Sequence, residues 1–278
     1  EGRLIWYAFG KPILTDYGTQ YTPLMDQPWM NNRISVDHKA DHRLGGKVLA
    51  AALTDGVDYV CGQIPIEGLH PVSEWPLRFT EEHTAAGHPA LPDATHHLWR
   101  RRVLYLHELE AIVLLDQIDG PLPTDWSIHV LADGARVHGA RATLRGQFGL
   151  DIAVDFLAPH NPRIEISGYS HLGFDEPGQR HFHWRDIRWT APPGLTITAM
   201  AERTTILRAR AESNQPYLAI LTAYPNDDPR PTVVRGEREW SATLTSVRGQ
   251  VEIATEPPFD TWRVRIATPH SRYERILS

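Results

Sequence analysis

Two runs near the middle of the chain decide its fold class: Ile112-Val113-Leu114-Leu115-Asp116 and Ser127-Ile128-His129-Val130-Leu131. The first is a short apolar run, and the second alternates polar and apolar residues. Both patterns are typical of β-strands, because successive side chains of a strand point to opposite faces. Similar runs occupy residues 150–156, 163–166, 181–190, 195–200, 217–223, 251–255 and 262–268. The sequence therefore predicts a chain built mainly of strands.

The spacing of the turns favours one architecture for these strands. The 22 Pro and 20 Gly separate the runs as turn residues would, and no fixed-period repeat suggests a propeller. Residues 46–53 are the best helix candidate, yet the Gly and Asp residues on both sides favour a strand. The least strand-like stretch, residues 64–97, contains five Pro and is expected to form a loop. We predict an all-β fold, a large antiparallel multi-sheet β-sandwich of supersandwich type with few or no helices.

The length of 278 residues suits one large β domain. Residues 1–278 are expected to form a single β-sandwich region, and the alternative is a division into a main sandwich, 1–200, and a smaller C-terminal sheet, 201–278. The chain opens at Glu1 and enters a strand-like run almost at once. We therefore expect an excised domain or a processed fragment.

Charge and cysteine content exclude several classes of function. A net charge of -6 gives no reason to expect nucleic acid as a partner. Cys61 is the only cysteine, so the chain can form no internal disulfide and no thiolate zinc cluster, and its apolar flanks predict a buried strand thiol. No apolar run approaches the length of a membrane helix, and no signal-peptide pattern is present. Phosphate loops, nucleophile elbows and zincin motifs are also absent from the sequence.

Arginine dominates the basic residues, with 25 Arg against three Lys. The guanidinium group can bind a carboxylate or sulfate group through two parallel hydrogen bonds, which the ammonium group of Lys cannot do. A GC-rich genome would give the same bias, so both explanations remain open.

Several segments resemble a known family. Residues 10–21, read Gly-Lys-Pro-Ile-Leu-Thr-Asp-Tyr-Gly-Thr-Gln-Tyr, and residues 29–37, read Trp-Met-Asn-Asn-Arg-Ile-Ser-Val-Asp, resemble the opening of the C-terminal β-sandwich of heparinase II/III-like polysaccharide lyases. There a Tyr precedes His-Asn-Thr-Val and a strand. Residues 100–105 and 112–118 look like that family's next strand pair, and residues 127–131 lie where it has an aromatic or His-bearing strand. The similarity covers residues 5–131, and beyond them only the β pattern agrees.

The resemblance implies an enzyme with two parts. Such lyases pair a helical toroid with the sandwich and cleave a uronic-acid-containing acidic polysaccharide in the cleft between them by β-elimination. Periplasmic or secreted location follows from the same resemblance. The toroid is absent from these 278 residues, so the fragment alone is expected to show little or no turnover.

A uronate lyase must neutralise the C5 carboxylate, remove the adjacent proton and protonate the leaving oxygen. Tyr21, which matches the family Tyr, and His97 are the predicted catalytic residues, with aromatic packing as the alternative for Tyr21. The predicted substrate-binding residues are Asn31, Arg33, His96 and Arg102. For Arg33 a solvated strand position is the competing interpretation, and Asn32 is interpreted as a turn or capping residue.

Metal binding is the weakest part of the prediction. Asn31 stands where the family has a His implicated in metal binding or catalysis, which puts a conventional zinc site in doubt. His181 and His183 could contribute two ligands from one strand face, yet a solvent-facing polar strand explains them equally well. A structural zinc or calcium ion therefore stays a possibility. His38, His42 and His70 are further candidates in predicted loops.

Two other classes of function stay open. A non-catalytic carbohydrate-binding or scaffold sandwich would need an exposed aromatic platform, which Trp75, Trp99, Trp126, Trp184 or Trp189 could supply. A glycoside hydrolase would need a carboxylate pair about 5–10 Å apart, which sequence alone cannot identify. A helical region of roughly 300 residues upstream of Glu1, the size that the resemblance implies, would favour the lyase.

Overall fold

The computed structural model describes residues 2–16, 31–37, 40–43, 45–70, 97–170, 173–174 and 203–278. Within this part the chain is all-β, as predicted, and its one helical element is the short 3₁₀ turn η2 (His107–Leu109). No helix in the described ranges has the length and apolar character needed to cross a membrane.

The strands divide between one large sheet and one small sheet. In chain order they are β1 (Trp6–Ala8), β2 (Lys11–Leu14), β3 (Ile34–Val36), β4 (Ala40–Arg43), β5 (Lys47–Leu53), β6 (Val57–His70), β7 (His97–Leu106), β8 (Ala111–Asp119), β9 (Thr124–His138), β10 (Arg141–Gly146), β11 (Leu150–Ala158), β12 (Arg163–Ser170), β13 (Gly173–Phe174), β14 (Arg203–Ala211), β15 (Tyr217–Pro225), β16 (Thr232–Arg235), β17 (Ser241–Ser246), β18 (Gly249–Thr255), β19 (Trp262–Ala267) and β20 (Arg272–Leu277).

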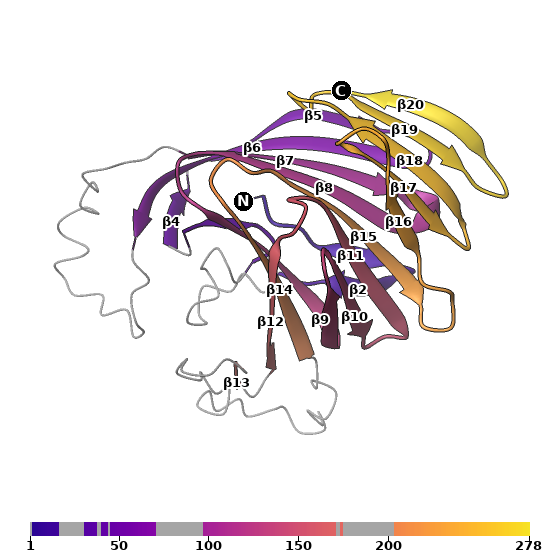
Figure 1. Cartoon of the computed structure of the whole chain (residues 1–278), viewed down its shortest axis with the longest axis horizontal. Coiled ribbons are helices and arrows are strands. Elements are labelled where there is room, and N and C mark those ends of the chain that lie inside the picture. Colours follow the sequence, from indigo (N-terminus) through magenta and orange to yellow (C-terminus); the bar gives the residue numbers. More distant parts are fainter. Residues whose placement is uncertain are drawn as a thin grey trace, which may run out of the picture.

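The large sheet is antiparallel and curls back on itself (Figure 1). Its main path runs β13-β12-β14-β9-β10-β11-β15-β8-β7-β6-β4. The long strand β9 belongs to both halves, because its first part pairs with β14 and its last part pairs with β10. We call the half formed by β12, β13, β14 and the start of β9, with β1–β3, the first half-sheet, and the remainder the second half-sheet.

The C-terminal sheet is a separate five-stranded meander, β16-β17-β18-β19-β20. It begins at Thr232, so the possible division after residue 200 does not coincide with a sheet boundary. Strands β14 and β15 lie beyond that point in sequence and are part of the large sheet.

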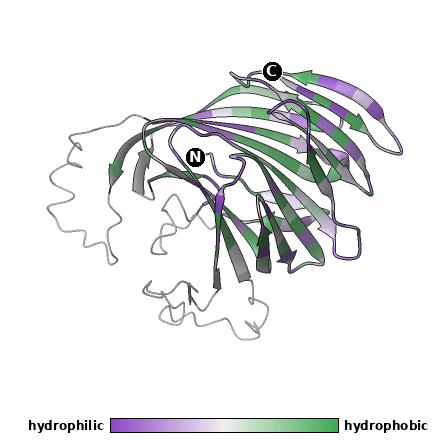
Figure 2. Cartoon of the chain, viewed as in Figure 1, coloured by the Kyte–Doolittle hydropathy of each residue, from purple (hydrophilic) through white to green (hydrophobic). Residues whose placement is uncertain are grey.

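Two apolar cores separate three layers. Trp126 and Ile128 of the first half-sheet share one core with Trp99 and Leu114 of the second half-sheet. The opposite face of the second half-sheet packs on the C-terminal sheet, and this second core contains Trp262. Figure 2 shows hydrophobic positions spread through the strands of the large sheet, as a layer covered on both faces requires.

A buried carboxylate organises the first core. Asp116 on β8 is fully buried, and its two oxygens accept hydrogen bonds from Trp99 Nε1 and Trp126 Nε1, both at 2.8 Å. Arg101 donates two more bonds of 2.7 Å from Nε and Nη2, and its Nη1 reaches the carbonyl oxygens of Gly2 and Asn32 at 2.8 and 2.6 Å. Because the charge is paired and its oxygens are satisfied, this network can lie in an apolar core.

Two local predictions are confirmed and two lie outside the described residues. The preference for a strand at residues 46–53 is confirmed by β5, and Cys61 is a buried free thiol on β6. The runs predicted at 181–190 and 195–200 fall outside the described ranges.

Candidate functional site

A polar face lies on β9, directed away from the first core. Because side chains alternate along a strand, Trp126 and Ile128 enter the core while Asp125, Ser127 and His129 point to the other side. All three polar residues are at most 1% exposed. Polar groups are rarely buried so fully without a structural or functional reason.

Neighbouring strands extend this polar face. On β3, Ser35 lies opposite Asp125, and on β14, Arg208 and Arg210 lie opposite Ser127 and Asp125. Directly opposed residues of an antiparallel pair share a face and have Cβ atoms about 4.5–5.5 Å apart. We define the polar face as Ser35, Asp125, Ser127, His129, Arg208 and Arg210.

Three atoms of the polar face lack hydrogen-bond partners. The hydroxyl oxygens of Ser35 and Ser127 and the Nε of Arg208 are buried, and no residue in the described ranges forms a hydrogen bond with them. Both serines are fully buried. A buried, unsatisfied polar group costs about 1–3 kcal/mol, so these groups mark a place where a further hydrogen-bonding molecule or segment fits.

The accessible rim of the polar face is charged. Arg210 is 43% exposed at its side chain and lies 3.8 Å from a carboxylate oxygen of Asp37 and 3.7 Å from one of Asp125. Both distances exceed a direct hydrogen bond, so the guanidinium keeps donors available. The rim thus presents a guanidinium group, which suits an oxyanion, while the imidazole and hydroxyl groups of the polar face are buried behind it.

The turn before β3 is clamped to this face. Asn32 Nδ2 donates to the carbonyl oxygens of Leu4 and Thr15 at 2.6 and 2.8 Å, and its Oδ1 accepts from the backbone N of His129 at 2.5 Å. The prediction of a structural Asn32 therefore agrees with its contacts. Asn31 is fully buried in the same turn, and its carbonyl oxygen accepts a hydrogen bond from Arg33 N at 2.8 Å.

Arg33 is buried and not a solvated strand residue. It is fully buried, its Nε donates to the Ile34 carbonyl oxygen at 3.0 Å, and its guanidinium lies 5.3 Å from the centre of the Trp99 ring. The interpretation as a solvated strand residue was wrong because Trp99 packs against its charged end. Its carbonyl oxygen accepts from Ser127 N at 3.0 Å, so the turn and β9 are joined through the backbone as well.

His97 lies elsewhere, at the start of β7. Its side chain is 2% exposed, and burial lowers the pKa of its imidazole despite a hydrogen bond with the Asp119 backbone. A Cβ at Gly120 would overlap the His97 ring, which explains a glycine there. The buried Nε2 of His97 has no hydrogen-bond partner among the described residues. The sequence analysis predicted His97 as a catalytic residue of the substrate cleft, whereas its contacts in the described part of the chain are those of a core histidine.

Arg102 points to the opposite side of β7 from Arg101. It is 1% exposed, and its Nη2 donates to the Pro258 carbonyl oxygen at 3.1 Å and to Asp260 at 3.0 Å. Arg102 therefore connects the second half-sheet to the C-terminal sheet and does not belong to the polar face. The sequence pattern could not distinguish this structural role from substrate binding, because it does not show that both faces of β7 are covered.

Several predicted residues fall outside the described part of the chain. These are Tyr21, His96, His181 and His183, with His38 among the weaker candidates, and the side chains of His42 and His70. Their roles remain predictions. The hypothesis of an exposed aromatic platform is wrong for Trp99 and Trp126, because both are fully buried. No Trp in the described ranges is exposed, and Trp75, Trp184 and Trp189 lie outside these ranges.

The described residues do not fit a metal centre. No group of three His, Cys, Asp or Glu side chains gathers in the described ranges as a metal ion would need. Asn31, in the place of the family His, offers only an amide. A zinc or calcium ion remains a prediction that rests on residues outside these ranges.

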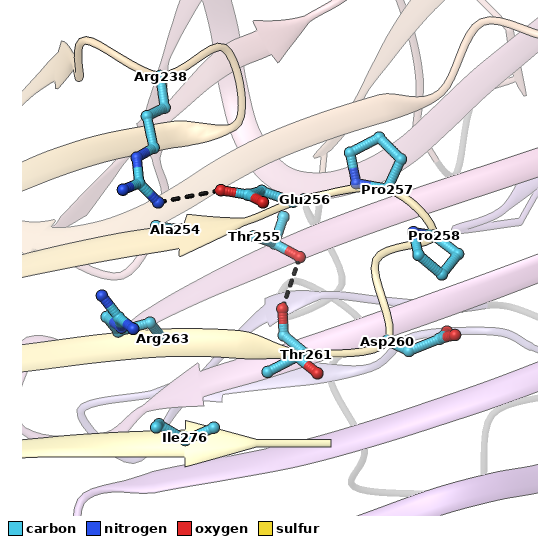
Figure 3. A pocket seen from close by; sticks show the side chains of 10 residues that line it. All are labelled: Arg238, Ala254, Thr255, Glu256, Pro257, Pro258, Asp260, Thr261, Arg263 and Ile276. Carbon is cyan, nitrogen blue, oxygen red and sulfur yellow. Dashed lines mark hydrogen bonds and ion pairs between the residues drawn. The ribbon is translucent and has the colours of Figure 1, made fainter.

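A concavity lies on the outer face of the C-terminal sheet (Figure 3). It is a shallow hollow of about 530 Å³. Arg238 and Glu256 pair across it at 3.0 Å, and Thr255 Oγ1 donates to the Thr261 carbonyl oxygen at 2.8 Å. Both charged side chains are more than 60% exposed, so the hollow is a solvated surface with its charges paired.

Comparisons with known proteins bear on the fold. Neither protein-family models nor curated proteins give a match. Among solved structures, the heparan sulfate lyase HepC from Pedobacter heparinus superimposes with a TM-score of 0.54 and 9% identity, over 96% of this chain. The heparinase III BT4657 gene product gives a TM-score of 0.51 and 10% identity over 97% of this chain. The chain has the β-sandwich fold of heparinases.

This heparinase-like sandwich spans about a third of the length of its solved counterparts, 35% of each chain. At identities near 10% the likeness concerns the fold alone. The resemblance seen in residues 5–131 is thus confirmed as a fold, and the match extends it through the C-terminal sheet. Sequence reasoning located the strand at residues 127–131 but named no residue of the polar face as a site residue; the available signal was the alternation of polar residues along β9 and β14.

Proposed function

We propose that the chain is the β-sandwich portion of a polysaccharide lyase that cleaves a uronic-acid-containing acidic polysaccharide by β-elimination. The observation that carries this proposal is the polar face, where two buried hydroxyl groups and the Nε of Arg208, which have no hydrogen-bond partner among the described residues, lie beside a buried imidazole in a heparinase-like fold. The helical toroid of the same parent chain is the proposed second wall of the cleft. A periplasmic or secreted location is part of the proposal.

The chemistry assigns different tasks to different groups. Arg208 and Arg210 are proposed to hold the uronate carboxylate, because a guanidinium binds a carboxylate through charge-assisted hydrogen bonds. Ser35 and Ser127 are proposed to bind sugar hydroxyl groups. His129 is the proton-transfer candidate on this face, alongside the earlier candidate Tyr21.

The remaining predicted residues take secondary places in the proposal. Asn31 is retained as a proposed substrate contact because its turn is joined to β9 by the hydrogen bond from Ser127 N to the Arg33 carbonyl oxygen. His96 is retained as a cleft candidate. We assign Arg33, His97 and Arg102 structural roles, on the contacts given above.

A lyase assay with the parent protein tests the function. Each β-elimination creates an unsaturated uronate that absorbs in the ultraviolet, so absorbance should rise with heparan, chondroitin, hyaluronan or alginate. In the parent, Arg208→Gln should lower kcat/KM about 10- to 100-fold, because a hydrogen bond to a charged group contributes about 1.5–3 kcal/mol. Arg238→Gln, an equal change on the C-terminal sheet, should leave kcat/KM unchanged.

Two outcomes would contradict the proposal. No gain in absorbance with any of the four polysaccharides would exclude lyase action on them and favour a non-catalytic carbohydrate-binding or scaffold module. Equal losses for Arg208→Gln and Arg238→Gln would remove the polar face from the mechanism.

A further inference from the structure

Strand β5 is an unusual edge of the large sheet. In the described part of the chain it pairs only with β6, so no strand of that part is hydrogen-bonded to its other backbone edge. From Val48 to Leu53 it reads Val-Leu-Ala-Ala-Ala-Leu, without a charge or a proline. Soluble proteins usually protect such an edge with charges, prolines or bulges, because it can pair with another strand. Here the protection is one irregularity in the pairing, between Val48 and Ala50.

The side chains of β5 divide between a packed face and an exposed face. Ala50 and Ala52 pack against the second core, beneath the C-terminal sheet. On the other face Val48 is 67% and Leu53 is 78% exposed, and Val60 of β6, 36% exposed, lies opposite Ala51. With Leu49, 46% exposed, these residues form a patch that we call the β5 edge patch. Contiguous exposed apolar residues at a free strand edge indicate an interaction surface.

The sequence of β5 is complementary to itself. If two β5 strands pair antiparallel about a two-fold axis at Ala51, the small alanines lie at the centre of the contact, the strands are about 4.7–4.9 Å apart, and exposed Leu53 lies opposite exposed Leu49 of the second copy. The same arrangement brings exposed Lys47, at the start of the strand, to exposed Asp55, which follows its end in the second copy. Two such opposite-charge contacts form per dimer. A strand from an unrelated protein would have no reason to match both the apolar centre and the charged ends.

We propose that β5 is the contact through which two copies of this chain associate edge to edge, so that the large sheet continues from one copy into the other. The polar face lies on the first half-sheet, away from this edge, so the association and the proposed lyase function are independent.

The oligomeric state of the 278-residue chain tests this proposal. Sedimentation equilibrium should show a monomer–dimer equilibrium, and Ala51→Lys should weaken the dimer at least tenfold by placing two ammonium groups together at the axis. Thr245→Lys, an equal change at an exposed position of β17, should leave the dimer unchanged. Circular dichroism of each variant separates loss of association from loss of fold.

A charge exchange provides the second test. Lys47→Asp should weaken the dimer several-fold because it faces Asp55 of the second copy, and Asp55→Lys should do the same. The double variant Lys47→Asp/Asp55→Lys should restore the wild-type dimer. A monomer at all concentrations, a dimer insensitive to Ala51→Lys, or a double variant no better than the single ones would each overturn the proposal.

Discussion

At the scale of single residues, Asp116 has the largest expected influence on stability. It is the shared acceptor for two indole N–H groups and the Arg101 guanidinium, all of them buried. Asp116→Asn keeps the shape but removes the charge, which leaves Arg101 uncompensated in the core. We expect a loss of about 3–5 kcal/mol in the free energy of unfolding, measured by urea denaturation.

A surface pair provides the control for this change. Asp133 lies 3.8 Å from Arg145, with both side chains at least 40% exposed. Asp133→Asn should change the free energy of unfolding by less than about 1 kcal/mol, because water screens exposed pairs. Similar losses for the two variants would mean that the Asp116 network is not the organising contact of the first core.

His97 makes stability depend on pH. Because burial lowers its pKa in the native state, the unfolded chain binds a proton at His97 at a higher pH than the native chain does. The contribution of the neutral ring is therefore complete above the unfolded value of about 6.5 and is lost as pH falls through the lower native pKa. We expect the free energy of unfolding, measured by urea denaturation, to decrease less between pH 7.5 and pH 5.5 in His97→Gln than in the wild type.

His138→Gln controls for removal of an imidazole from an exposed strand position. It should retain the wild-type loss of stability between the two pH values. If His97→Gln and wild type lose stability equally, the His97 ring is not held neutral by its burial.

At the scale of the elements, local pattern predicted the strands but not their neighbours. Alternation along residues 127–131 located a strand with His129 on one face, and β9 contains it. The pairing of β9 with β14 joins Ser127 to Arg208, far apart in sequence, and no local period carries that information. The polar face therefore appears only once the register is known.

The run Arg100-Arg101-Arg102 shows a second limit of the sequence. Alternation predicts that Arg101 and Arg102 point to opposite faces of β7, and they do. It does not say that both faces are covered, one by the first half-sheet and the other by the C-terminal sheet. A buried guanidinium that serves packing has the same sequence signal as one that binds substrate.

At the scale of the whole molecule, the C-terminal sheet covers the second half-sheet. The second core joins Tyr59, Leu104 and Leu218 of the large sheet to Trp262 and Val264 of the C-terminal sheet, all at most 1% exposed. Polar contacts reinforce this packing. Arg102 reaches the β18–β19 loop, and Arg235 Nη2 donates to the Phe156 carbonyl oxygen at 3.0 Å. We therefore predict that the two sheets fold as one unit.

Truncation tests whether the chain is a single region. Removal of residues 231–278 would expose the covered face of the second half-sheet, an apolar area much larger than soluble monomers tolerate. The shortened chain, residues 1–230, should aggregate or bind a hydrophobic dye and lose its cooperative thermal transition, followed by near-ultraviolet circular dichroism. The five-stranded sheet alone should fail in the same way, because Trp262 and Val264 would lose the surface that buries them. A soluble 1–230 chain with a cooperative transition would instead mean that the C-terminal sheet is a separate domain, because each core would then be sufficient by itself.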